Sequence, residues 1–257
     1  MHDYLSGLFS LEGRTAIVTG GSSGIGRGIA TALAGAGAAT VVVARGAERI
    51  DKTVRALTAA GGRAAGVVGD LRTRAGIRAV AEAAVEPFGE PDILVNPAGI
   101  NIRPPFAEVT EDDWDATLTV NALAPFLLGQ RYATGMAARG YGRLIHISSQ
   151  QAHRAFVGSG VYGVSKGAVE SLMRSEGEAW GGTGVTSNTL VPGFVLTPLN
   201  ARLQEDEAQI AALAARTMIG RNGLPEDFAA AAVFLAGPGS GYVTGHSLFV
   251  DGGLSAH

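Results

Sequence analysis

The sequence predicts a single α/β domain in which helices cover both faces of a parallel sheet. Of seven short apolar runs, six end in Gly, Asp or Ser and one ends in Arg, and stretches with helical spacing separate them. Strands that are apolar throughout are typical of a parallel sheet buried on both sides. Seven such strands in 257 residues fit one doubly wound domain that spans residues 1–257.

The carboxyl ends of these strands are where a ligand is expected to bind. The expected strands are, in chain order, 15–20, 39–45, 64–70, 92–99, 143–149, 185–193 and 247–253. Polar or conformationally special residues end several of them, namely Thr19, Arg45, Asp70, Asn96, Ser148, Ser149 and the Pro192–Gly193 pair. No long linker or repeat interrupts the pattern, so the site should belong to one sheet.

Composition indicates a globular protein that acts on small molecules. Hydrophobic residues make up 46% of the chain and charged residues 17%, while the net charge of −3 offers no field for a polyanion such as nucleic acid. Without cysteine, disulfides and thiolate metal sites are excluded, and the histidine spacing predicts no metal site. The absence of a long apolar run and of a signal-peptide pattern favours a cytoplasmic protein without a membrane segment.

A glycine-rich loop follows the first expected strand. The stretch TGGSSGIG contains Gly20, Ser22, Ser23, Gly24, Ile25 and Gly26. A tight turn at the start of a helix lets the backbone approach a pyrophosphate, whose charge meets free N–H groups. The alternative is a plain connector in a glycine-rich protein, but the position after the first strand favours a dinucleotide site.

The end of the second strand bears on which cofactor is bound. An acidic residue there suits the ribose hydroxyl of NAD, whereas an arginine suits the 2′-phosphate of NADP. Here the strand ends in Arg45, and no carboxylate follows until Glu48. A solvated loop charge is the other interpretation of Arg45. We expect NADP(H) in preference to NAD(H).

The stretch VYGVSKG places Tyr162 four residues before Lys166, one of only two lysines in the chain. On a helix this spacing puts both side chains on one face. A nearby ammonium favours the phenolate, so Lys166 is expected to lower the pKa of Tyr162 and make it a proton donor and acceptor. An ordinary surface pair is the alternative. Ser149, at the end of the preceding strand, would stabilise charge on a substrate oxygen.

Asn121 lies in a predicted helix that opens with a capping box from Thr110 to Asp113. Pro125 cannot donate to the carbonyl of residue 121, which leaves that oxygen free. Our hypothesis is that this carbonyl holds a water that relays protons to Lys166. A kinked core helix without a functional role is the alternative.

Taken together, these motifs closely resemble the short-chain dehydrogenase/reductase superfamily across nearly the whole chain. The resemblance implies a Rossmann fold, a homotetramer and a catalytic tetrad of Asn121, Ser149, Tyr162 and Lys166, with Lys166 also holding the nicotinamide ribose. It further implies cofactor contacts from Asp70, Leu71, Asn96, Ala98, Gly99, Pro192, Gly193, Val195 and Thr197. One departure is Pro97, where the family has a second asparagine. We expect altered local bonding there, without loss of activity.

Three segments are expected to face the substrate, which is a small-molecule alcohol or ketone: 100–103, 150–154 and a helical, amphipathic lid near 194–216. The last could instead be an oligomer contact. The polar candidates for substrate binding are Arg103, Ser149, Gln150, His153 and Tyr162. A surface role for His153 is an equal alternative, while His146 is expected to pack in the core.

The motif NIRPPF, among others, most resembles gluconate 5-dehydrogenases and related sugar-acid reductases, in which case Arg103 would anchor the substrate carboxylate. A 3-oxoacyl-thioester reductase is the alternative enzyme, with Arg103, Arg154 and Arg202 forming part of a basic entrance for an acidic acyl carrier. A catalytically silent nucleotide-binding regulator is the third possibility, against which the complete tetrad argues.

Overall fold

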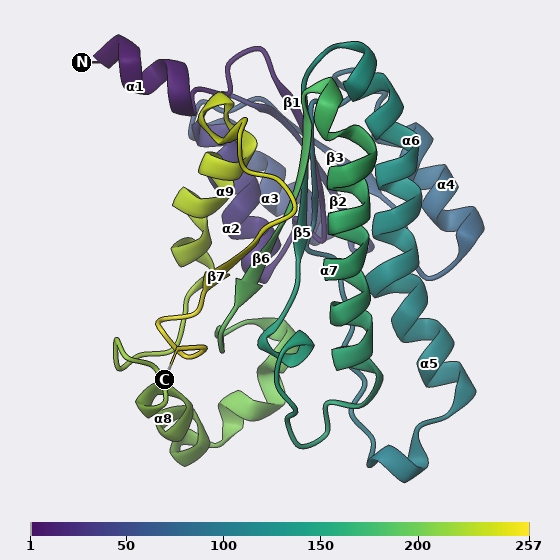
Figure 1. The fold of residues 1–257 in the computed structure, drawn as a ribbon, viewed down its shortest axis with the longest axis vertical. Coiled ribbons are helices and arrows are strands. Elements are labelled where there is room, and N and C mark those ends of the chain that lie inside the picture. The colour runs from purple at the N-terminus through teal and green to yellow at the C-terminus, as the bar shows by residue number, and fades with distance from the viewer. Residues whose placement is uncertain (1, 257) are drawn as a thin grey trace.

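The computed structural model describes residues 2–256 and contains one sheet of seven parallel strands (Figure 1). The strands are β1 (Thr15–Thr19), β2 (Ala39–Ala44), β3 (Ala64–Val68), β4 (Ile93–Asn96), β5 (Gly142–Ile147), β6 (Val185–Pro192) and β7 (Ser247–Val250). The sequence analysis predicted all seven. Each ends one to three residues earlier than predicted, because its last residues, which end in Gly, Asp, Ser or, after β2, Arg45, belong to the following loop.

The strand order is β3-β2-β1-β4-β5-β6-β7, so the direction of winding reverses between β1 and β4. Such a reversal opens a crevice at the carboxyl edge of the sheet, where doubly wound proteins bind their ligands. The residues that follow β1 and β4 therefore border this crevice. The fold is the Rossmann-like arrangement that the sequence predicts.

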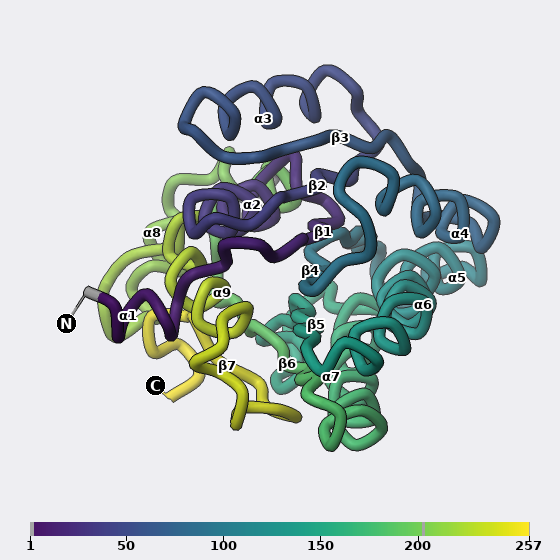
Figure 2. The backbone as a smooth tube through the Cα atoms, turned by 90° about the horizontal axis from the view of Figure 1, so that it is seen from above, coloured from purple at the N-terminus to yellow at the C-terminus, as the bar shows by residue number. Residues whose placement is uncertain are grey.

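Both faces of the sheet are buried, as apolar strands require. Successive residues point to opposite faces. Val18 packs on the face covered by the helices α2 (Gly24–Gly35) and α9 (Ala229–Ala236), whereas Ile17 packs on the face covered by α4 (Arg74–Ala83) and α6 (Ala124–Ala138). Figure 2 shows these two layers along the edge of the sheet.

The remaining α-helices are α1 (His2–Phe9), α3 (Ala47–Ala59), α5 (Glu111–Leu118), α7 (Gly160–Trp180) and α8 (Glu207–Ala215). The helix α3 packs beside β3, and α7 packs along β6. Within residues 2–256, no helix is both long enough and apolar enough to cross a bilayer.

The helix that carries Asn121 contains a π-helical turn, Thr119–Leu123, between α5 and α6. Its start confirms the predicted capping box, because Thr110 Oγ1 accepts from Asp113 N at 3.1 Å and Thr110 N donates to Asp113 Oδ2 at 3.1 Å. Pro125 has no N–H to give to Asn121, and Ala124 N bonds five residues back to Thr119 O. The proposed water relay at the Asn121 carbonyl stays a prediction.

The segment 194–216 differs from the single lid helix that the sequence predicts. It forms a 3-10 stretch, Pro198–Glu205, followed by α8. Asp206 separates them with an extended backbone, and its side chain caps α8 by accepting from Gln209 N at 3.0 Å. No residue of α8 is fully buried, but Ile210, Leu213 and Ala214 are half-buried on one face of the helix and its other residues are exposed.

Candidate active site

The glycine loop joins β1 to α2 in a conformation that only glycine adopts without strain. Gly20 and Gly24 have φ angles of +61° and +50°. A Cβ atom at Gly26 would lie 2.4 Å from the carbonyl oxygen of Gly20, so the loop folds tightly onto the start of the helix. Ser23 caps α2 without a side-chain hydrogen bond, which leaves N–H groups of the first turn free for an anion.

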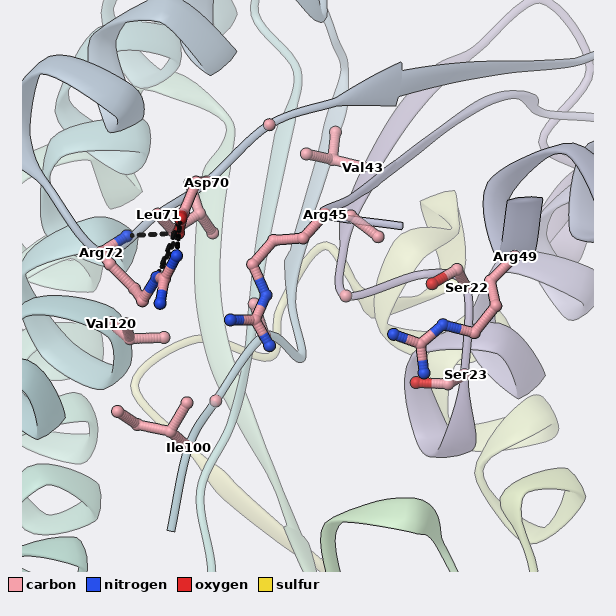
Figure 3. A pocket seen from close by; sticks show the side chains of 15 residues that line it. Ser22, Ser23, Val43, Arg45, Arg49, Asp70, Leu71, Arg72, Ile100 and Val120 are labelled. Carbon is pink, nitrogen blue, oxygen red and sulfur yellow. Dashed lines mark hydrogen bonds and ion pairs between the residues drawn. The ribbon is translucent and has the colours of Figure 1, made fainter. Parts of the chain in front are cut away.

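One end of the crevice is a cavity rich in arginine (Figure 3). Arg45, just after β2, and Arg49, in the first turn of α3, extend their guanidinium groups into it, and that of Arg49 lies beside Ser23. Asp70 and Leu71 line its far side. The sequence analysis did not single out Arg49, although a second arginine four residues after Arg45 could have indicated it.

Asp70 is paired with Arg72 within this cavity. Arg72 Nε donates to Asp70 Oδ2 at 2.8 Å, and this hydrogen bond, more than any other contact, holds the pKa of Asp70 below its usual value. The guanidinium of Arg72 is thereby already engaged by a carboxylate. Among the residues drawn in Figure 3, no dashed line joins the guanidinium of Arg45 or Arg49 to a carboxylate.

A larger cleft continues from this cavity toward α7, and the two share Gly20, Ser23, Arg45, Arg49, Ala98 and Gly99. We call the combined space the groove. The residues singled out from the sequence that line it are Gly20, Ser22, Ser23, Gly24, Ile25, Gly26, Arg45, Asp70, Leu71, Ala98, Gly99, Arg103, Ser149, Tyr162, Lys166, Pro192, Gly193, Val195 and Thr197. Tertiary structure thus gathers residues from six of the strand ends and from α7.

Tyr162 and Lys166 lie on the first turns of α7 and are almost fully buried. Lys166 Nζ donates to the carbonyl oxygen of Ile147 at 2.7 Å and lies 5.5 Å from the centre of the Tyr162 ring. Ser149, just after β5, lies close enough to Tyr162 to hydrogen-bond its phenol. The three side chains therefore share one wall of the groove.

Burial dominates the proton affinity of this pair. It raises the pKa of Tyr162 to about 12, while the Ser149 hydrogen bond and the charge of Arg103 act in the opposite direction. It also lowers the pKa of Lys166 to about 8, since a desolvated ammonium is disfavoured. The net shift of Tyr162 is thus opposite to the one expected from the sequence, because desolvation outweighs the neighbouring charges and Lys166 is not among the groups that lower the pKa.

The Asn121 side chain lies outside the groove and ties two of its walls together. Its Oδ1 accepts from Ile100 N at 2.9 Å, and its Nδ2 donates to Ile100 O at 2.9 Å and to Ser165 Oγ at 3.0 Å. Ile100 follows β4, and Ser165 precedes Lys166 on α7. The side chain of Asn121 therefore fixes the loop after β4 against the helix that carries Tyr162 and Lys166.

Asn96 is also buried behind the groove, not in it. Thr19 Oγ1 lies 3.4 Å from its Oδ1, and its Nδ2 lies 3.3 Å from Nδ1 of His146, which packs in the core as expected. These contacts tie β1, β4 and β5 together at the crevice. Pro97, next in the chain, lines the groove beside Ala98.

Of the polar residues in the loop after Ser149, one lines the groove and the others hydrogen-bond to distant parts of the chain. Gln151 lines the groove, whereas Gln150 Nε2 donates to Asp251 Oδ2 at 2.5 Å. His153 Nε2 hydrogen-bonds Glu170 Oε1 at 2.8 Å and lines a neighbouring cavity. Arg154 Nη1 donates to the carbonyl of Leu254 at 3.1 Å. Gln150 and His153 thus do not line the groove where the sequence analysis expected substrate contacts.

The loop after β4 places two polar side chains in the groove. Arg103 and Asn101 both line it beside Tyr162. The amide oxygen Oδ1 of Asn101 is buried and has no hydrogen-bond partner. An amide oxygen at this place can accept a hydrogen bond from a hydroxyl or an amine. The side chain of Arg202, expected at the entrance, lies outside the described part of the chain.

A crevice that joins the start of a helix after a glycine loop to a buried tyrosine and lysine and a half-buried serine is typical of an oxidoreductase that uses a dinucleotide. Comparison with known proteins identifies the family. Residues 20–255 match a family model described as enoyl-(acyl carrier protein) reductase. The chain belongs to the short-chain dehydrogenase/reductase family and is an oxidoreductase that acts on CH–OH groups.

Individual relatives are similar along their whole length. A gluconate 5-dehydrogenase of Gluconobacter oxydans is 39% identical over 248 residues, which are 96% of this chain and 97% of the relative. A gluconate 5-dehydrogenase of Burkholderia cenocepacia, solved in complex with NADP and tartrate, is 38% identical with a TM-score of 0.92 over 98% and 99% of the chains. A 3-oxoacyl-(acyl-carrier-protein) reductase of Agrobacterium tumefaciens, solved with NADP, is 34% identical with a TM-score of 0.91 over 96% of each chain.

Proposed function

We propose that this protein is an NADP(H)-dependent reductase and dehydrogenase of a sugar acid, such as the pair 5-ketogluconate and gluconate. The observation that carries the proposal is the placement of Arg103 and the unpaired Asn101 oxygen beside Tyr162 in one groove. An arginine suits a carboxylate, and an amide oxygen accepts from a hydroxyl. The gluconate dehydrogenases among the relatives support the same substrate class.

Ketone reduction needs a hydride at the carbonyl carbon and a proton at its oxygen. NADPH supplies the hydride when bound. The Tyr162 hydroxyl donates the proton, and the Ser149 hydroxyl donates a hydrogen bond that stabilises the developing alkoxide. Lys166 and a water at the Asn121 carbonyl return a proton to the tyrosine, while the Asn121 side chain fixes the surrounding backbone. Oxidation of the alcohol uses the same groups in reverse.

The preference for NADP(H) rests on the arginine-rich cavity. Arg45 and Arg49 can offer forked donors to a 2′-phosphate, and Arg72 is occupied by Asp70. No carboxylate takes the place of Arg45 at the end of β2, where an NAD-dependent enzyme would hold the ribose hydroxyls. The solved relatives that contain NADP agree with this preference.

The first test is an absorbance assay at 340 nm that offers NADPH and NADH with a panel of keto-sugar acids and acyl thioesters. We expect NADPH oxidation with a keto-gluconate, and a rise in KM of tenfold or more for that substrate in Arg103→Ala. NADPH binding without turnover of any substrate on the panel would show that the substrate assignment is wrong. Turnover of acyl thioesters alone would overturn the sugar-acid assignment.

The acyl-thioester reductase remains the second candidate. The family model carries an acyl-carrier-protein description, and a relative of that activity shares the fold. Of the three arginines proposed for an acidic carrier, Arg103 lies in the groove and Arg154 donates to the C-terminal backbone. Of the two whose side chains the structure describes, Arg103 is therefore the one that lines the groove.

A homotetramer in the cytoplasm belongs to the same proposal. Several large apolar side chains are exposed, among them Phe106, Trp114, Phe126 and Val164. Exposed apolar surface of this kind commonly marks a protein contact. Light scattering of the purified protein should give four times the mass of 26.1 kDa, and a monomer would contradict this.

A further inference from the structure

The helix α7 carries two buried carboxylates that have parallel surroundings. Glu170 contacts a serine and a histidine, Ser148 and His153. Glu176 likewise contacts Ser187 and His146. Neither glutamate has a part in the chemistry described above, and both are at least 95% buried. Burial of a carboxylate costs free energy unless hydrogen bonds offset the loss of hydration, so the contacts of each glutamate indicate a structural role.

The contacts of Glu170 lie on both sides of Ser149. Ser148 Oγ donates to Glu170 Oε1 at 2.6 Å, and His153 Nε2 hydrogen-bonds the same oxygen at 2.8 Å. Ser148 precedes Ser149 directly, and His153 follows it by four residues. One carboxylate oxygen therefore contacts residues on both sides of Ser149 in the short loop 148–154. We call this segment the serine loop.

Glu170 also belongs to the helix that carries the other reacting groups. Tyr162, Lys166 and Glu170 follow one another at intervals of four residues, so they lie on adjacent turns of one face of α7. Because both residues belong to one helix, the distance between the phenol of Tyr162 and the carboxylate of Glu170 is fixed by α7. Glu176, six residues further along, contacts β5 and β6 instead and does not touch this loop.

We propose that Glu170 is a positioning residue that sets Ser149 against Tyr162 by anchoring Ser148 and His153 to α7. This inference rests on the proposed function, since it assigns Ser149 and Tyr162 their roles at the substrate oxygen. Correct alignment of such groups carries a large share of the rate, and a displacement of about 1 Å can cost on the order of a hundredfold. Loss of the anchor should therefore lower kcat more than it weakens binding.

The test compares Glu170→Ala with Glu170→Gln and with the control Glu176→Ala, each as full-length protein. Gln keeps an acceptor oxygen for Ser148, whereas Ala removes it. Two measurements are made: steady-state kinetics with the substrate that the wild type turns over, and hydrogen exchange of the amides of residues 152–154 in the free enzyme. These amides donate within the serine loop, to Ser149 O and Gln150 O.

We expect kcat to fall tenfold or more in Glu170→Ala, with the Kd for NADPH within twofold of the wild type, and to stay within threefold in Glu170→Gln. Exchange at residues 152–154 should quicken tenfold or more in Glu170→Ala, while Glu176→Ala leaves these amides and kcat near the wild-type values. If a glutamate-to-alanine variant does not fold, Ser148→Ala or Ser187→Ala breaks the corresponding contact from its other side.

Equal loss of kcat in Glu170→Ala and Glu176→Ala, or unchanged exchange in the serine loop, overturns the inference. The exchange measurement needs no substrate. If the wild type reduces no sugar acid, the proposed function fails, but the anchoring role of Glu170 is still decided by exchange.

Discussion

Lys166 is a buried basic residue whose desolvation carries a cost in stability. It is 97% buried, and its ammonium has one described hydrogen bond, to the carbonyl of Ile147. Burial lowers its pKa from 10.5 to about 8. A proton held more weakly in the folded protein than in the unfolded chain destabilises the fold, and such costs are characteristic of functional sites.

The stability of Lys166→Met relative to the wild type should therefore depend on pH. Below pH 8 both states of the wild type bind the proton, and the burial cost is present in full. Between pH 8 and 10.5 the unfolded state binds more protons, so wild-type stability rises with pH. The gain from Met should be largest below pH 8 and shrink toward pH 10.5 in thermal unfolding. A pH-independent difference, like that expected for the exposed Lys52→Met, would contradict the assignment.

Arg45 and Arg49 should together determine the choice of cofactor. Each hydrogen bond to a charged group contributes about 1.5–3 kcal/mol, so loss of either should raise the KM for NADPH about tenfold or more. We expect the double variant Arg45→Ala/Arg49→Ala to bind NADPH no better than NADH. The KM for NADH should change less than threefold. Arg72→Ala is the matched control, because Asp70 already engages that guanidinium; an equal effect there would refute the assignment.

At the scale of elements, the glycine loop shows why one position of α2 requires glycine and another does not. Gly26 stands where α2 packs on the turn, and a Cβ there would meet the Gly20 backbone at 2.4 Å. Gly35, at the other end of the same helix, has open space around it. Backbone atoms thus leave no room for a side chain at Gly26, whereas Gly35 on the same helix can accept one.

Gly26→Ala should therefore displace the loop and weaken NADPH and NADH alike, by tenfold or more in Kd, because backbone atoms cannot move aside as a flexible side chain can. Gly35→Ala should leave both affinities unchanged and stabilise the protein by up to about 1 kcal/mol through helix propensity. Fluorescence titration and thermal unfolding measure the two effects. Normal cofactor affinity in Gly26→Ala would show that the close approach is not required.

At the scale of the whole molecule, the last strand and the C-terminal segment support the middle of the chain. Asp251 accepts from Gln150 Nε2, and also from Gly253 N at 3.0 Å and Ser255 N at 2.8 Å. Residues a hundred positions apart thus brace the serine loop. Gly252 O also accepts from Ile219 N at 3.3 Å, which connects the same segment to the chain after α8.

Asp251→Ala should lower the free energy of unfolding by about 1–3 kcal/mol, because the amide of Gln150 loses its buried partner. Chemical denaturation measures this, and kcat should fall with it. Glu86→Ala, which removes an exposed carboxylate, should change stability by less than about 0.5 kcal/mol. A stability change in Asp251→Ala no larger than in this control would contradict the bracing role.

Local sequence patterns were enough to predict the strands, their parallel arrangement and the residues gathered at their carboxyl ends. Periodicity and turn residues are local, and the Tyr162–Lys166 spacing and the glycine loop are read within one helix turn or one loop. For the same reason the sequence predicted most of the residues that line the groove, together with the capping box at Thr110.

Side-chain contacts and burial depend on residues that are distant in the sequence, so only the tertiary structure revealed them. It turned Gln150 and His153 toward Asp251 and Glu170, buried the Asn121 and Asn96 side chains behind the groove, and added Arg49 to the cofactor cavity. It also raised the pKa of Tyr162, because desolvation depends on everything packed around a group and not on the lysine one turn away.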